Sequence, residues 1–193
     1  MSTIYTLNGK VLKNAANDKW LIKAVPPAPS FDSVTIGSQI WMSKNLAIDD
    51  GEGGIYTQTA NYGQGEVTEY YYTWDAAVRV AASLEGWHLP SQAEWNTLLS
   101  SVGGTFTAGT KLKSTYGWDN SKNGTDDYGF AVFPSGIYIN GSFIYLGGVA
   151  GLWASTEYSA TKAYFASFGT NSDVTITNDR KTYASSVRLI KDV

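Results

Sequence analysis

The sequence predicts an α+β domain with two helices and several short, mostly antiparallel strands. Only 16% of its residues are charged, whereas 14% are aromatic and 20 are glycines, a composition typical of short strands joined by turns. Segments 73–83 and 91–102 carry helix signals, and the chain from residue 130 onward is a series of strand-like runs separated by Gly, Asn and Ser. Helices followed by a run of strands indicate the α+β class.

Composition also excludes several kinds of function. The chain has no cysteine, which rules out disulfides, cysteine zinc sites and cysteine nucleophiles, and its single histidine cannot build a His-rich metal centre. A net charge of −3 without a basic run predicts that nucleic acid is not a partner. The chain as given shows neither a signal-peptide core nor a segment of transmembrane length, so we expect no membrane insertion.

The N-terminal part is predicted to stand apart from the main domain. Strand-like runs at 3–7 and 19–25 precede a spacer with three prolines between residues 26 and 29, which hold the backbone extended. The first segment is expected to attach the protein or to build a homo-oligomer. The predicted divisions are an N-terminal segment 1–25, a Pro-rich spacer 26–32 and a ligand-binding domain 33–193.

Two elements open the main domain. Alternating apolar residues around Gly37 and Ser38 predict a β-hairpin within 33–46. The Ala-rich segment 73–83 predicts a helix with Thr73 as its N-cap.

The second predicted helix begins with a capping box. The Ser91 hydroxyl is expected to accept from the Glu94 amide, while the Glu94 carboxylate reaches back to the cap. Trp95, Leu98 and Leu99 then share one helical face, which we expect to be buried. Gly103-Gly104 ends the helix.

Three features near these helices have a structural and a functional interpretation. His88 is interpreted as a packed or capping histidine rather than a ligand or base. Glu94 is expected to form a buried pair with Arg188 rather than to catalyse. The run EYYYTW at 69–74 is expected in the core, with a sugar-stacking platform as the alternative.

Two acidic loops raise the question of calcium. Residues 119–124 imitate the first half of an EF-hand loop, but Phe130 stands where the bidentate acid belongs, and Asp49–Gly54 is a second acidic cluster. Turn-forming Asn and Asp explain both loops equally well. We therefore predict no metal and no other cofactor, with calcium as the alternative.

Seven motifs occur together in a fixed order along the chain. They are "TIGSQIWMSKNL", "YTWDAA", "GWHLPSQAEWNTLL", "AGTKLKS", "NGTDDYGF", "LWASTEY" and "SVRLIKD". In this order they resemble the Fibrobacter succinogenes major paralogous domain from about residue 33 to residue 192. The resemblance implies a C-type-lectin-like fold, related to that of the formylglycine-generating enzymes.

The resemblance also bears on catalysis and compartment. The formylglycine-generating enzymes work through active-site cysteines, which this chain lacks, so we expect no enzymatic activity. Members of the family often carry cysteines where this chain has Ser83 and Leu189. Loss of both predicts assembly in a reducing compartment, as for a phage particle built in the cytoplasm.

The C-terminal segment 159–186 resembles the variable region of proteins diversified by retroelements. Adenine mutagenesis of Asn codons in such systems cannot produce Gln, Glu, Lys, Met or Trp. The segment has no Gln, Glu, Met or Trp, and only Lys162 and Lys181 depart from this rule. Its Ser, Asn, Asp and Tyr residues are those with which paratopes make adaptable contacts.

Strand alternation predicts which side chains of this segment meet a ligand. Tyr164, Val174 and Ile176 are expected to point inward, whereas Phe165 and Tyr183 are expected to act as exposed aromatic anchors. The predicted ligand-binding residues are Ser159, Thr161, Phe165, Ser167, Thr170, Asn171, Asp173, Thr175, Thr177, Asn178, Asp179, Arg180, Thr182, Tyr183 and Ser185.

The function expected from these features is binding without catalysis. The partner would be a protein or glycan on a bacterial surface, and the protein would belong to a phage virion or a bacterial surface. One alternative is a cell-surface or structural paralogue without a diversified site. Another is a carbohydrate-binding lectin.

Overall fold

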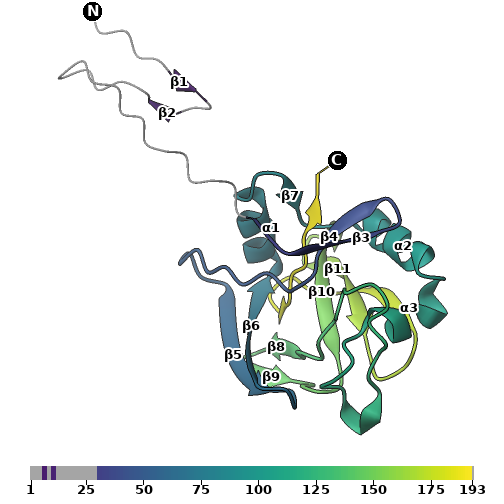
Figure 1. Cartoon of the computed structure of the whole chain (residues 1–193). Helices are drawn as coiled ribbons and strands as arrows, with labels where there is room; N and C mark the ends of the chain where they lie inside the picture. Colours follow the sequence, from purple (N-terminus) through teal and green to yellow (C-terminus); the bar gives the residue numbers. More distant parts are fainter. Residues whose placement is uncertain (1–5, 8–9, 12–29, 193) are drawn as a thin grey trace, which may run out of the picture. The chain divides into compact units, whose positions relative to one another are not determined.

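The computed structural model describes residues 6–7, 10–11 and 30–192 (Figure 1). The chain divides into two compact units, Met1–Ser30 and Phe31–Val193. In the first unit, β1 (Thr6–Leu7) pairs antiparallel with β2 (Lys10–Val11). The strand predicted at 19–25 lies outside the described residues, and the attachment role of segment 1–25 stays a prediction.

The second unit opens with the predicted hairpin. β3 (Ser33–Ile36) and β4 (Gln39–Met42) pair around Gly37, whose φ of 62° suits a residue without a side chain. β4 also pairs with β14 (Ile190–Lys191), which in turn pairs with β7 (Trp87–His88). The sheet of order β3-β4-β14-β7 therefore joins the two ends of the unit.

A five-stranded sheet has the order β5-β6-β13-β8-β9. Its strands are β5 (Ile55–Asn61), β6 (Glu66–Thr73), β13 (Ala184–Ser185), β8 (Ile137–Ile139) and β9 (Ser142–Ile144). Tyr71, Tyr72 and Trp74 of the EYYYTW run are buried. The core interpretation of this run is confirmed, because no ring of these three is available to stack on a sugar.

Both predicted helices form with the predicted caps. α1 (Trp74–Ala82) begins after Thr73, whose side chain accepts from the Ala76 amide. α2 (Gln92–Ser101) begins after Ser91, and both hydrogen bonds of the capping box with Glu94 are present. Trp95, Leu98 and Leu99 are buried, as their common helical face predicts.

The prediction of two helices is wrong, because the structure adds a third, α3 (Thr105–Leu112). Its sequence TFTAGTKL contains β-branched threonines and a glycine, which are weak helix formers, and Gly104 supplies no side-chain cap. Ala108 and Leu112 are nevertheless fully buried in the core. Tertiary packing rather than local propensity therefore stabilises this helix. A short 3₁₀ helix, η1 (Asp119–Ser121), follows.

The C-terminal hairpin belongs to a three-stranded antiparallel sheet of order β10-β11-β12. Its strands are β10 (Ala150–Ser159), β11 (Lys162–Phe168) and β12 (Val174–Arg180). Helices α2 and α3 lie on one side of β10 and β11, and the five-stranded sheet lies on the other (Figure 1). The three-stranded sheet is therefore an inner layer, and its central strand β11 is covered on both faces.

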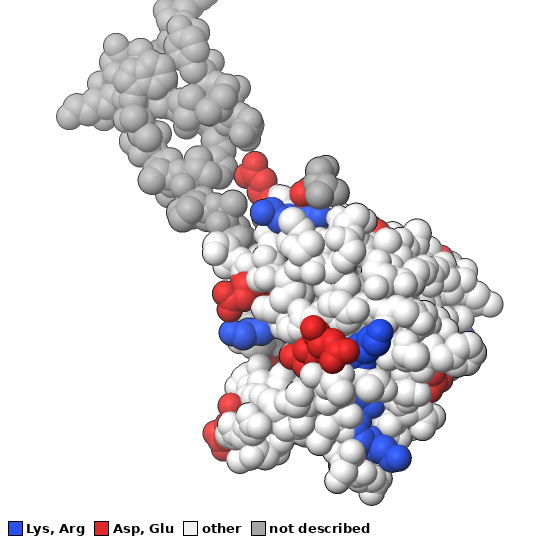
Figure 2. Space-filling view, turned by 45° about the vertical axis from the view of Figure 1, so that its right-hand side comes forward, with Lys and Arg blue, Asp and Glu red and all other residues white. Residues whose placement is uncertain are grey.

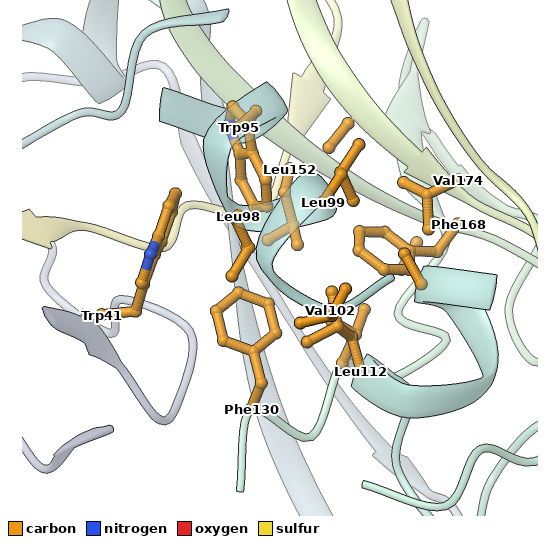
Figure 3. Packing of buried hydrophobic residues seen from close by; sticks show 14 of the residues in the cluster. Trp41, Trp95, Leu98, Leu99, Val102, Leu112, Phe130, Leu152, Phe168 and Val174 are labelled. Atoms are coloured by element: carbon orange, nitrogen blue, oxygen red, sulfur yellow. The ribbon is translucent and has the colours of Figure 1, made fainter. Parts of the chain in front are cut away.

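Two hydrophobic clusters fill the spaces on either side of this sheet. The first gathers α2 and α3 side chains against Trp41, Phe130 and the sheet, as Figure 3 shows. The second gathers α1 side chains with Trp153, Phe165 and Leu189. Every strand-to-strand ladder in the described residues is antiparallel, so the α+β class with mostly antiparallel strands is confirmed.

The surface carries few charges. On the face drawn in Figure 2, acidic and basic side chains stand in small groups separated by uncharged surface. Among the described residues, no helix has the length and apolarity that crossing a membrane would require.

Candidate functional site

Of the fifteen predicted ligand-binding residues, twelve fall into three groups on or next to the β11–β12 hairpin. Ser167, Thr175, Thr177 and Asp179 alternate onto one face of the two strands, which we call the hairpin face. A second group, Thr170, Asn171 and Asp173, lies in the loop that joins the strands, and a third lies around the opposite end of the hairpin: Ser159, Thr161, Arg180, Thr182 and Tyr183. Asn178 alternates onto the face opposite to the hairpin face.

These three groups do not form one continuous patch. Each strand of the hairpin has seven residues, which separates its two ends by roughly 20 Å. Thr175 is exposed, whereas Ser167, Thr177 and Asp179 are half-buried. Ala163 and Phe165 lie on the same face and are buried, so the candidate surface is the part of the hairpin face formed by Ser167 and the edge strand β12.

Two of the predicted residues are wrong because they are buried. Phe165 is only 8% exposed and packs on Trp153 with ring centroids 5.8 Å apart, so it cannot serve as an exposed anchor. Alternation fails here because β11 lies between two hydrophobic clusters and both of its faces are apolar. Ser185 is 4% exposed, since β13 pairs with β6 on one side and β8 on the other.

The inward prediction is confirmed for Val174, which is buried, and in part for Tyr164 and Ile176. The latter two are half-buried and pack against the first cluster. Beyond them, the exposed ring of Tyr158 meets Tyr164 edge-on at 5.4 Å. Tyr183 is half-buried and lies 5.8 Å from the Arg180 guanidinium.

A buried lysine anchors the loop at one end of the hairpin. Lys113 Nζ donates to the carbonyl oxygens of Lys122, Gly169 and Asn171 at 2.8, 3.2 and 3.1 Å. Burial lowers the pKa of this ammonium group, but three acceptors and the Trp118 ring at 4.6 Å compensate its charge. No local motif around Lys113 marks this role. The loop that carries Thr170 and Asn171 is therefore held on a fixed support.

Gly109 supports the same loop from α3. Its amide donates to Ser172 O at 2.8 Å, and a Cβ built at this position would stand 2.6 Å from that oxygen. Alanine normally stabilises a helix interior relative to glycine by about 0.5–1 kcal/mol. We expect Gly109→Ala to do the opposite and to lower the free energy of unfolding by about 1–3 kcal/mol, because loop and helix must separate. Urea denaturation measures this.

The matched control is Thr110→Ala, at an exposed position of the same helix. It should leave stability within about 0.5 kcal/mol. A gain in stability for Gly109→Ala would contradict the close contact between α3 and the 169–173 loop.

His88 joins the capping box of α2 to the C-terminus. Its Nε2 lies 2.8 Å from Glu94 Oε1, and its Nδ1 lies 2.5 Å from Asp192 Oδ1. The predicted Glu94–Arg188 pair is wrong, because histidine takes the place of arginine beside this carboxylate. Both imidazole nitrogens are engaged, which agrees with a structural rather than a catalytic or metal-binding role.

The pKa of His88 depends on these partners. Burial alone would lower the pKa, but the hydrogen bonds to Glu94 and Asp192 outweigh it and raise the pKa above the usual value. Protonated His88 therefore stabilises the fold fully below about pH 6.5, and this stabilisation is lost as the pH rises through the raised folded-state pKa. We expect the free energy of unfolding to fall as the pH rises from about 6.5 through the raised folded-state pKa of His88.

Denaturant unfolding across that range checks the prediction, with His88→Gln as the comparison. Because the chain has one histidine, the difference between the two proteins isolates His88 from the carboxylates. An unchanged pH profile in His88→Gln would contradict the assignment.

The acidic loops use their oxygens within the chain. Asp49 Oδ1 accepts from the Gly51 amide, and Asp50 accepts from the Glu52 amide and from Arg79. Asn123 Oδ1 accepts from the Trp118 amide. Among residues 30–192, no three His, Asp or Glu side chains gather so that they could hold a metal ion. The turn interpretation accounts for these contacts, and the absence of a cofactor stays a prediction.

A cavity of about 520 Å³ lies away from the hairpin face and has no counterpart in the sequence prediction. Glu69 and Arg188 line it, both almost fully buried, together with Asn45, Asp126 and the rings of Tyr116 and Phe133. These residues come from β6, the end of the chain and three connecting segments, which explains why no local motif marks them. A glutamate inside the aromatic run EYYYTW was the one signal that could have suggested it.

An asparagine separates the charges of this cavity. Asn45 Nδ2 donates to Glu69 Oε2 at 2.8 Å, while Asn45 Oδ1 accepts from Arg188 Nη2 and Nε at 2.8 and 3.2 Å. Arg188 Nη1 also donates to Phe130 O. Burial raises the pKa of Glu69, and it lowers the pKa of Arg188 to about 10. No carboxylate of the described residues lies within 4.0 Å of this guanidinium.

Comparison with known proteins gives one match. The sequence profile of the Fibrobacter succinogenes major domain (Fib_succ_major) matches residues 34–191. No curated protein matches the chain, and no solved structure does. Since the match spans most of the 193 residues, the chain belongs to the Fibrobacter succinogenes major domain family.

Proposed function

We propose that this domain is a non-enzymatic binding module that recognises a protein or glycan on a bacterial surface through its hairpin face. The main support for this function is the difference between the two strands of the hairpin, because β11 is covered whereas β12 is a polar edge strand. β11 is fixed between two hydrophobic clusters, while Ser167 and the edge strand β12 present hydroxyl and carboxyl groups. Adaptable polar side chains on a rigid support suit recognition.

The loop at the end of the hairpin extends this surface. Thr170, Asn171 and Asp173 lie beside a backbone that Lys113 and Gly109 hold in place. A preformed loop loses little conformational entropy on binding. Exposed side chains there can therefore change identity without a change in the support.

The fold family of the domain and the origin of its hairpin sequence are part of the same hypothesis. We propose a C-type-lectin-like fold and a hairpin diversified by a retroelement, on a phage virion or bacterial surface. The lack of Gln, Glu, Met and Trp in 159–186 supports diversification. The gene neighbourhood tests this point, because a diversified gene lies near a template repeat and a reverse transcriptase. Their absence would favour a paralogue without a diversified site.

Binding itself is tested by a triple variant, Thr175→Ala, Thr177→Ala and Asp179→Ala. The fluorescently labelled full chain is measured by flow cytometry on a panel of fixed bacterial cells and on an array of bacterial glycans. We expect the variant to lose tenfold or more in affinity, since central interface contacts can each cost about 2 kcal/mol.

The control changes Thr57, Thr59 and Glu66 to alanine, because these residues are exposed on β5 and β6 and lie outside both the hairpin face and the lining of the cavity. It should bind as the unmodified chain does. Unchanged binding by the hairpin variant, or no binding of the unmodified chain to any cell or glycan, would contradict the proposal.

A further inference from the structure

The cavity beside Glu69 has features of a ligand site that the hairpin face does not explain. Its volume of about 520 Å³ lies within the range of small-molecule sites. Glu69 is only 6% exposed, and a carboxylate so deeply buried requires partners. Its Oε2 accepts from Asn45, but no described residue donates to its Oε1. Since Oε1 is not among the buried atoms without a partner, it is open to the cavity and can accept from a ligand there.

Two unpaired side-chain atoms lie near Glu69 in the fold but outside the lining of the cavity. Gln58 is its direct partner across β5 and β6, so the two side chains leave the same face of the sheet. Among the described residues, the buried atoms without a hydrogen-bond partner are Gln58 Oε1 and Tyr62 Oη. Burial and the neighbouring Glu69 charge raise the pKa of Tyr62 to about 12. Neither Gln58 nor Tyr62 lines the cavity, so the acceptor that is open to a ligand there is Glu69 Oε1.

The walls of the cavity favour an organic donor. Tyr116 and Phe133 meet edge-on with ring centroids 4.9 Å apart, and such rings attract an alkyl chain and its cationic end. Calcium sites draw on several carboxylates, and the described residues bring no three His, Asp or Glu side chains together.

The charge balance also favours a cation. Glu69 and Asp126 contribute two carboxylates to the cavity, and Arg188 is the buried cation beside them. The Arg188 guanidinium donates to Asn45 Oδ1 instead of to Glu69, so it does not form an ion pair with this carboxylate. The Lys44 ammonium is highly exposed and pairs with Asp32 at 3.1 Å, so its charge is balanced outside.

We propose that this cavity binds an alkylammonium group, with Glu69 as its counter-ion and with Tyr116 and Phe133 against its alkyl chain. The group belongs either to a free amine or to a lysine side chain of a polypeptide. This site shares no residue with the hairpin face, so either proposal can fail without the other.

The experiment is a titration of the ¹⁵N-labelled full chain, followed by amide chemical shifts. The probes are 1,5-diaminopentane, Nα-acetyl-lysine N-methylamide and, as an uncharged control, 1-pentanol. We expect saturable shifts at residues 44–47, 67–70 and 114–116 with at least one amine and none with pentanol. A response to the diamine alone identifies a free amine, and a response to the lysine derivative identifies a side chain.

Two variants locate the counter-ion. Glu69→Gln keeps an oxygen for Asn45 but removes the charge, and it should weaken amine binding by about tenfold or more. Glu66→Gln, at an exposed position of the same strand, should bind as the unmodified chain does.

Three results would overturn the proposal: no saturable shift with either amine at concentrations on the order of 10 mM, equal shifts with pentanol, or undiminished binding by Glu69→Gln. The comparison of amine with alcohol uses the unmodified chain, so it decides the question even if Glu69→Gln does not fold.

Discussion

We expect Trp95→Ala to lower the free energy of unfolding by about 3–5 kcal/mol. Trp95 is fully buried at the centre of the first cluster, with its ring centroid 4.8 Å from that of Trp41 and 6.3 Å from that of Phe130 (Figure 3). Its Nε1 donates to Trp153 O at 3.3 Å, so truncation leaves both a cavity and an unpaired carbonyl. The helix, the first hairpin and the inner sheet all lose a shared contact.

Urea denaturation followed by far-ultraviolet circular dichroism measures this loss without relying on tryptophan fluorescence. Asn96→Ala, at the next and exposed position of α2, should change stability by less than about 0.5 kcal/mol. A loss below about 1 kcal/mol for Trp95→Ala would contradict this prediction, because it would mean that neighbouring side chains refill the space that the indole ring leaves.

A loss of similar size, about 3–5 kcal/mol, is expected for Arg188→Met. Methionine fills much of the space but cannot donate to Asn45 Oδ1 or Phe130 O, which the guanidinium now satisfies. The change also removes the positive charge that favours ionised Glu69 and Asp126 in their buried positions. The 4.5 Å contact between the guanidinium and the Phe130 ring is lost as well.

A double variant separates charge from packing. If Arg188 compensates Glu69, then Glu69→Gln should cost less in the Arg188→Met background than in the unmodified chain. Lys44→Met is the control for loss of a surface charge and should cost no more than about 1 kcal/mol, because its pair with Asp32 is exposed. Strict additivity of Arg188→Met and Glu69→Gln would contradict an electrostatic link between the two residues.

Local signals in the sequence predicted the elements whose stability is largely local. The capping box of Ser91 and Glu94, the cap at Thr73 and the turn at Gly37 each depend on residues within a few positions of one another. The apolar face of α2 was equally readable, because helical periodicity alone brings Trp95 and Leu98 together.

The predicted site failed where strand alternation was the only guide. Alternation assigns two faces to a strand, but it cannot say that both are covered, as they are for β11 at Phe165. It also cannot say that Ser185 sits between two other strands. Glu94 received the wrong partner for a related reason: Arg188 and His88 were both available, and only the position of β14 beside β7 chooses between them.

By itself, the sequence determined the α+β class, both capped helices, the first hairpin and the exclusion of cysteine chemistry, because composition and contacts of short range decide these. Tertiary structure alone decided three things: that the weak helix former 105–112 is helical, that Lys113 holds the 169–171 loop, and that Glu69 and Arg188 share a cavity. Each depends on burial and on partners from distant parts of the chain. A buried charge or an unfavourable helix is stable only where the folded chain supplies those partners, and no local pattern records them.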